Sequence, residues 1–216
     1  AFIPDVAILD PELTVSLPEH VTAQSGMDAL AHAIEAYVST ESSIVSDFNS
    51  LKAIELISSS LTTAYHNPHD LIARERMLLG SYFAGIAFSN ASTNLAHATA
   101  RPLGAHFHLP HGLSVALTLP AVVQFSQPTA QHRYETIMKQ LKTNDLFLFL
   151  IELNKSLRIY EDAKEQINLD TLKQAVPTLI KDALSGNGIK TNRKIPSEKD
   201  VTNVYQHIMN MLMGEL

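Results

Sequence analysis

Thirty residues near the middle of the chain, Ala91 to Pro120, constrain the fold and chemistry most. They contain four of the ten histidines: His97, His106, His108 and His111. The residues between them are mainly small or apolar, and Arg101 is the one charged side chain among them. Histidines concentrated in an apolar segment indicate a metal site or a proton-transfer site. For any one of them, the alternative is a partly buried, hydrogen-bonded helix residue.

A second motif lies upstream, in the segment GMDALAHAIEAY at residues 26–37. Its small and apolar residues recur at helical spacing, which predicts an amphipathic helix. Asp28 and His32 are four residues apart, so they lie one turn from each other on one face. An Asp-x-x-x-His pair is commonplace by itself, but His97 and His111 could complete a four-ligand set. One carboxylate and three imidazoles suit Fe²⁺, Zn²⁺ or a similar borderline metal.

Composition excludes several function classes. The chain has 216 residues, of which 45% are hydrophobic, enough for one large core or two small ones. Its net charge of −6 and the lack of a basic run argue against nucleic acid or anionic membranes as partners. No apolar run reaches the ~18 residues of a membrane span, and no signal peptide is readable. The absence of cysteine fits a reducing compartment, so we expect a cytoplasmic protein.

Helical periodicity covers most of the chain, which predicts an all-α, multi-helix bundle formed by residues 1–216 as a single domain. A short extended segment is expected at 2–9, and a loop carries His106 and His108. Pro110 should open a helix with His111 in its first turn, and Pro120 should kink or shorten that helix. No Gly-x-Gly-x-x-Gly or P-loop motif is present. The other predicted helices are 18–39, 44–66, 70–89, 94–105, 129–141, 144–157, 170–184 and 197–213.

The segments GMDALAHAIEAY and HATARPLGAHFHLPHG together resemble the iron-containing (group III) alcohol dehydrogenases, over nearly the whole chain. The match is to the all-helical, metal-binding C-terminal domain of that family, which is dehydroquinate synthase-like. The family's N-terminal α/β dinucleotide-binding domain is absent from this sequence, which begins at Ala1 without methionine. The resemblance therefore implies a truncated chain or a fragment, which we expect to be inactive in isolation.

The resemblance implies a metal site formed by Asp28, His32, His97 and His111. The implied metal is Fe²⁺, with Zn²⁺ as the alternative. It would act as a Lewis acid on the oxygen of a small alcohol or aldehyde. Hydride would move to or from NAD(P) bound by the absent domain. The full-length enzyme is expected to be a homo-oligomer.

Three further residues match positions near the family's site. Phe88 and Asn90 match the segment that approaches nicotinamide and substrate, although Phe88 suits a plain core role nearly as well. Arg101 stands where the family commonly has a histidine, and arginine cannot shuttle protons at neutral pH. Arg101 either anchors an acidic group of the substrate or, the favoured reading, pairs with Glu35 or another pocket carboxylate. Glu35 itself is either an acceptor behind a metal ligand or a solvated or helix-packing residue.

Two other functions remain open from the sequence. The first is a zinc-dependent relative, such as a glycerol dehydrogenase or a dehydroquinate synthase. The second is a non-catalytic helical domain with a structural metal, which would have a closed coordination shell without a position for substrate. The PHG motif, together with the Asp/His/His/His quartet, favours the iron-type alcohol dehydrogenase.

Overall fold

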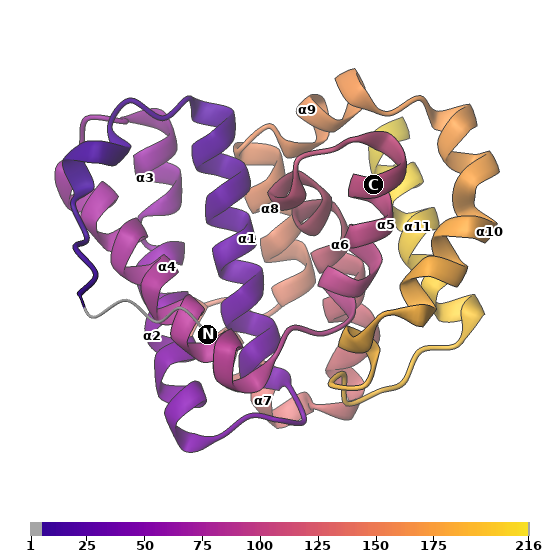
Figure 1. Ribbon diagram of the computed structural model, residues 1–216, viewed down its shortest axis with the longest axis horizontal. Helices are drawn as coiled ribbons and strands as arrows, with labels where there is room; N and C mark the ends of the chain where they lie inside the picture. The colour runs from indigo at the N-terminus through magenta and orange to yellow at the C-terminus, as the bar shows by residue number, and fades with distance from the viewer. Residues whose placement is uncertain (1–5, 216) are drawn as a thin grey trace.

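The computed structural model describes residues 6–215, and this part of the chain is all-α, without a strand (Figure 1). The predicted fold class is therefore confirmed. The α-helices are α1 (Glu19–Val38), α2 (Ile44–Ser58), α3 (Leu61–His66), α4 (Leu71–Ala91), α5 (Leu95–Phe107), α6 (His111–Ser126), α7 (Gln131–Leu141), α8 (Leu146–Ser156), α9 (Ile159–Gln166), α10 (Leu169–Ser185) and α11 (Glu198–Met213). Short 3₁₀ helices occupy Pro11–Thr14 (η1), Gln127–Thr129 (η2) and Asn187–Ile189 (η3). No helix within residues 6–215 combines the length and apolarity that crossing a membrane requires.

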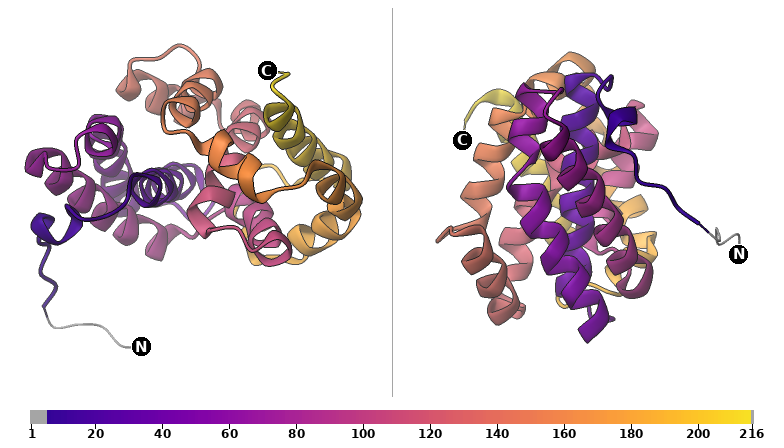
Figure 2. Two further views of the ribbon diagram at one scale, coloured as in Figure 1. Left: turned by 90° about the horizontal axis from the view of Figure 1, so that it is seen from above. Right: turned by 90° about the vertical axis from the view of Figure 1, so that its left-hand side faces the viewer.

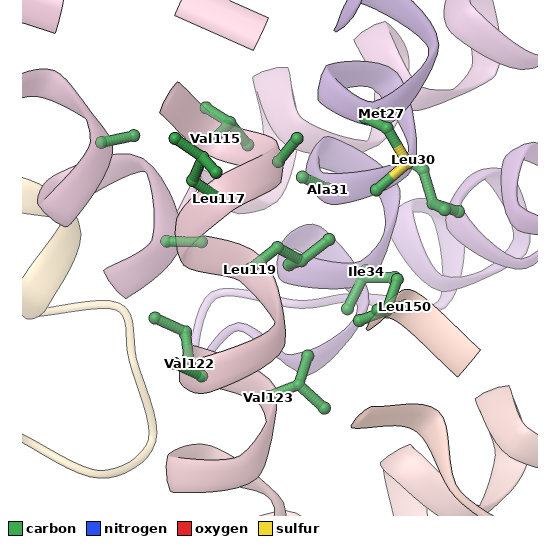
Figure 3. Close-up of a cluster of buried hydrophobic side chains, with 14 of the residues drawn as sticks. Met27, Leu30, Ala31, Ile34, Val115, Leu117, Leu119, Val122, Val123 and Leu150 are labelled. Atoms are coloured by element: carbon green, nitrogen blue, oxygen red, sulfur yellow. The ribbon is translucent and has the colours of Figure 1, made fainter. Parts of the chain in front are cut away.

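Helix α1 lies at the centre of the molecule. It packs against α2 and α4 on one side and against α6 on the other (Figure 1). Seen from above, it is viewed nearly end-on between these two groups of helices (Figure 2, left). Met27, Leu30 and Ile34 of α1 meet Leu119 of α6 and Leu150 of α8 in the core (Figure 3). A helix that is apolar on most of its faces is stable only when other helices surround it, and this places the Asp28 motif in the interior.

Helix α6 continues through Pro120, although the sequence predicts a kink or an early end there. Proline has no N–H, so the carbonyl of Ala116 loses its normal partner four residues later. The buried side chain of Asn154, on α8, replaces that partner: its Nδ2 donates to the Ala116 carbonyl at 2.8 Å. A contact between two helices therefore satisfies the backbone group that proline leaves unpaired.

Replacing Asn154 by leucine is expected to lower the free energy of unfolding by about 1–3 kcal/mol, because the Ala116 carbonyl is left buried without a donor. Urea denaturation measures the change. In a Pro120→Ala background the backbone N–H regained at that position can serve the carbonyl, so the same Asn154→Leu change should cost less. Equal costs in both backgrounds would show that the Asn154 bond does not compensate for the proline.

The predicted helix 44–66 is wrong in one respect, because it is broken into α2 and α3. The break falls at Ser59 and Ser60. The Ser59 hydroxyl donates to the carbonyls of Glu55 and Leu56, at 2.8 and 3.1 Å. Serine side chains compete with the helical backbone for such acceptors, and two in succession end the helix.

A helix that the sequence prediction lacks, α9, begins after Arg158. Arg158 adopts a left-handed backbone conformation with φ 58°, in a stretch without glycine or proline to signal a turn. The readable signal was the acidic pair Glu161 and Asp162 in the first turn of the helix, which complements the helix dipole.

Two smaller predictions concern the N-terminal segment and the loop expected around His106 and His108. The segment expected to be extended at 2–9 forms no helix and no strand over residues 6–9, and residues 2–5 lie outside the described part of the chain. The described portion leads away from the helices (Figure 2), with Ile8 86% exposed. His106 lies in the last turn of α5 and not in a loop, and His108 ends that helix in a left-handed conformation with φ 56°.

Candidate metal centre

Three helices bring the predicted ligands together. Helix α1 carries Asp28 and His32, α5 carries His97, and α6 begins at His111. Helix α6 packs against both α1 and α5. Residues as far apart in the sequence as Asp28 and His111, 83 positions, therefore meet where these helices adjoin.

Asp28, His97 and His111 form the tightest group. Their potential ligand atoms all lie within 4.8 Å of one another. Asp28 Oδ1 is 3.3 Å from His97 Nε2 and 3.5 Å from His111 Nε2. Asp28 Oδ1 and His97 Nε2 are both buried, yet they are not aligned for a hydrogen bond and have no other partner. Buried polar atoms are nearly always paired, and a divalent cation among these atoms would satisfy both, so the residues fit a metal.

His32 lies beside this group. Its ring stacks between Phe88 and His97, with ring centroids 4.2 and 4.4 Å away. Its Nδ1 is 3.9 Å from Asp28 Oδ2. Burial, aided by the charge of His97, lowers the pKa of His32 to about 4, so the ring is neutral near pH 7, the form that ligates metals. The described residues bring three of the four predicted ligands into one group, and His32 as the fourth stays a prediction.

Glu35 is almost completely buried, at 2% exposure. Its Oε2 lies 2.6 Å from His97 Nδ1 and accepts from the Asn94 N–H at 3.0 Å, and its Oε1 accepts from the Ala96 N–H at 2.6 Å. Burial lowers the pKa of His97, but the charges of Glu35 and Asp28 and the hydrogen bond to Glu35 raise it to about 9. Of the two roles that the sequence left open for Glu35, the geometry matches the acceptor behind a metal ligand.

The remaining predicted residues lie at or beyond the edge of this centre. Phe88 is half-buried, with its ring stacked on His32 and its side chain also packed against the small apolar cluster of Ala36, Ala87 and Ala91. Asn90 is exposed, and its Nδ2 donates to the carbonyl of Ile86 in its own helix at 2.8 Å. Arg101 is exposed and forms no ion pair within residues 6–215. The expected pair between Arg101 and Glu35 is not formed, because backbone N–H groups and His97 occupy both Glu35 oxygens.

The centre is closed at one end and open at the other. The His97 side chain is 3% exposed, whereas that of His111 is 52% exposed. A small molecule from solvent can therefore reach the group on the His111 side. A structural metal site would be enclosed on all sides.

Known proteins share both the sequence and the fold. Residues 22–209 match the model of the "Fe-containing alcohol dehydrogenase family, C-terminal". The chain is 47% identical over 143 residues to the probable alcohol dehydrogenase EutG of Escherichia coli, covering 66% of this chain and 36% of that protein. It is 39% identical over 216 residues to the NADPH-dependent butanol dehydrogenase of Clostridium saccharobutylicum, covering 94% and 55%.

Among solved structures, the iron-containing alcohol dehydrogenase of Thermococcus thioreducens matches with a TM-score of 0.88 and 31% identity. The match covers 96% of this chain and 55% of that one, so the chain spans roughly half the length of such relatives or less. These similarities confirm the family that the histidine and aspartate motifs indicated. The chain belongs to the iron-containing alcohol dehydrogenase family and corresponds to its C-terminal, all-helical domain.

Proposed function

We propose that Asp28, His32, His97 and His111 hold a divalent cation, Fe²⁺ in preference to Zn²⁺, and that this centre serves an NAD(P)-dependent alcohol dehydrogenase. The observation that carries the proposal is the pair of buried, unpaired atoms, Asp28 Oδ1 and His97 Nε2, that converge with the His111 imidazole. A divalent cation bound there supplies a Lewis acid that polarises the oxygen of an alcohol or an aldehyde.

Individual residues around the centre have separate proposed roles in metal binding and substrate access. Asp28 contributes the negative charge, and burial of His32 keeps that ring neutral and able to donate a lone pair. The exposed side of His111 leaves an approach for substrate. Phe88 covers the His32 ring and excludes water from that face. We assign Asn90, at the exposed end of the same helix, to contact with the nicotinamide or the substrate.

We also propose that residues 1–216 act as one helical domain and that dinucleotide binding belongs to a separate part of the full-length enzyme. The sequence has no glycine-rich phosphate-binding turn. The relatives are longer, and one of them is an NADPH-dependent butanol dehydrogenase. A non-catalytic structural metal is the weaker alternative, because the centre is open on the His111 side. Metal analysis of anaerobically purified protein separates the iron enzyme from a zinc-dependent relative.

Metal binding is tested on the chain after treatment with EDTA. At a free concentration near 100 Kd, a bound cation should stabilise the fold by about 2.7 kcal/mol. For a domain of this size, that raises Tm by roughly 5–10 °C. Zn²⁺, or Fe²⁺ without oxygen, should produce the shift. Mg²⁺ should not, because it prefers oxygen ligands. A Tm unaffected by any of the three, or affected equally, would contradict the proposed centre.

Arg101 is proposed as an anchor for an anionic group on the substrate, since its guanidinium has no ion-pair partner within residues 6–215 and can bind a carboxylate in a bidentate manner. The test compares full-length enzyme with its Arg101→His variant on matched substrates with and without a carboxylate. For the acidic substrate kcat/KM should fall on the order of 10²-fold, and for the neutral one it should be nearly unchanged. Equal losses on both substrates would leave Arg101 without an anchoring role.

A further inference from the structure

Glu35 is a buried acid whose one basic partner within residues 6–215 is the ring of His97. No lysine or arginine within residues 6–215 forms an ion pair with it, and its carboxylate contacts only the Asn94 N–H, the Ala96 N–H and the ring of His97. Burying an unbalanced carboxylate is costly. The N–H groups at the start of α5 offset part of the free energy of burying the carboxylate, since the N-terminus of a helix favours negative charge. The rest must come from a positive charge at or beyond His97.

The charges of the centre balance when a dication is present. Asp28 and Glu35 carry one negative charge each, and His32, His97 and His111 are uncharged when they act as ligands. A divalent cation therefore neutralises the two carboxylates, whereas a proton on His97 alone would neutralise only one. This balance explains why a second carboxylate, that of Glu35, is buried behind His97, although Glu35 itself is not one of the proposed metal ligands.

Glu35 also determines which nitrogen of His97 is free. An ionised carboxylate accepts hydrogen bonds but cannot donate them. When the His97 ring is neutral, as a metal ligand must be, Glu35 Oε2 at 2.6 Å from Nδ1 places its single ring proton on Nδ1 and leaves the lone pair on Nε2. That nitrogen is the one 3.3 Å from Asp28 Oδ1, inside the centre.

Resting on the proposed metal-binding function, we propose that Glu35 is the positioning residue of the metal centre: it fixes the tautomer and orientation of His97 and supplies the second negative charge that matches a divalent cation. The same carboxylate accepts from the backbone of α5, so it also ties the helix that carries His97 to α1.

A Glu35→Gln variant removes the charge with little change in size. The amide has one oxygen and one NH₂ group, while three donors surround the present carboxylate. If the oxygen faces Ala96, the NH₂ group faces His97 Nδ1, which must then accept. The ring proton moves to Nε2, where it blocks the lone pair that a metal needs.

The experiment measures Zn²⁺ affinity by calorimetry on the EDTA-treated chain. Glu35→Gln should weaken binding by about 10–100-fold, the usual effect of losing a hydrogen-bond partner behind a metal-ligating histidine. Asn94→Ala is the matched control, because it deletes the bond from Asn94 Nδ2 to the Glu35 backbone carbonyl, 2.8 Å long, and leaves the carboxylate and imidazole unchanged. That variant can lose stability, but its Zn²⁺ affinity should stay within a few-fold of wild type.

The outcomes separate this role from the metal site itself. A wild-type chain that binds no Zn²⁺ removes the proposed function and this role with it. Wild-type affinity in a folded Glu35→Gln variant overturns the positioning role alone. If Glu35→Gln does not fold, nitrogen NMR of the Zn²⁺-loaded wild type decides: the His97 ring proton is expected on Nδ1, and a metal-bound Nδ1 would overturn the proposal.

Discussion

Asp28→Asn should abolish metal binding at any practical concentration. Within residues 6–215, the Asp28 carboxylate is the one negatively charged group in direct reach of both His97 Nε2 and His111 Nε2. We expect Zn²⁺ affinity to fall by at least ~10³-fold, because losing a partner one step further from the metal already costs about 10–100-fold. Calorimetry with Zn²⁺ measures the loss, and the stabilising shift of Tm by Zn²⁺ should disappear with it.

Asparagine has nearly the shape of aspartate, so the Asp28→Asn variant should remain folded by circular dichroism without metal. Asp162→Asn is the matched control. Asp162 is also partly buried and accepts a single bond, from Gln24 Nε2 at 3.3 Å, but it lies on α9 outside the centre. Its loss should leave Zn²⁺ affinity unchanged. Undiminished Zn²⁺ binding by Asp28→Asn would exclude Asp28 as a ligand.

Gly112→Ala should produce the largest loss of stability from a single methyl group in this chain. Gly112 follows His111 at the start of α6, where that helix crosses α1. A Cβ there would lie 2.3 Å from the backbone oxygen of Gln24 and 2.7 Å from its carbonyl carbon. Overpacking costs about 1–3 kcal/mol, and we expect the upper end because backbone, unlike a side chain, cannot rotate away.

For a domain of this size, a loss near 3 kcal/mol lowers Tm by roughly 6–12 °C. Moving the start of α6 also displaces His111, so Zn²⁺ affinity should fall together with Tm. Gly85→Ala is the matched control, because a Cβ at Gly85 meets nothing within 4 Å. Alanine is the better helix former there, and stability should rise by about 0.5–1 kcal/mol. Equal Tm values for the two variants would refute a tight α1–α6 crossing.

The sequence by itself determined the helical class and most helix positions, because the signals that start a helix act within one turn. Asp70 illustrates this: its carboxylate accepts from the Ala73 N–H at 2.9 Å and caps α4 where the sequence places the start. The ligand set could be proposed from the sequence for a similar reason, together with the family resemblance. Asp28 and His32 lie on one helix face, and the spacing of the histidine motif is a property of the chain.

Only the tertiary structure decided which distant residues supply the hydrogen-bond partners that a local segment lacks. Pro120 is tolerated because Asn154 reaches Ala116 from another helix, and no local pattern announces that bond. The sequence allowed a solvated Glu35, and only the packing of α5 beside Glu35 of α1 shows that its carboxylate accepts from the Asn94 N–H.

The same limit applies to the edges of the centre. The stacking of His32 between two rings and the exposure of Arg101 depend on where whole helices lie, because a side chain's partners are set by packing. Local hydrogen bonds and helical periodicity extend over about four residues, whereas the contacts that pair His97 with Glu35 and satisfy that buried carboxylate arise between residues tens of positions apart.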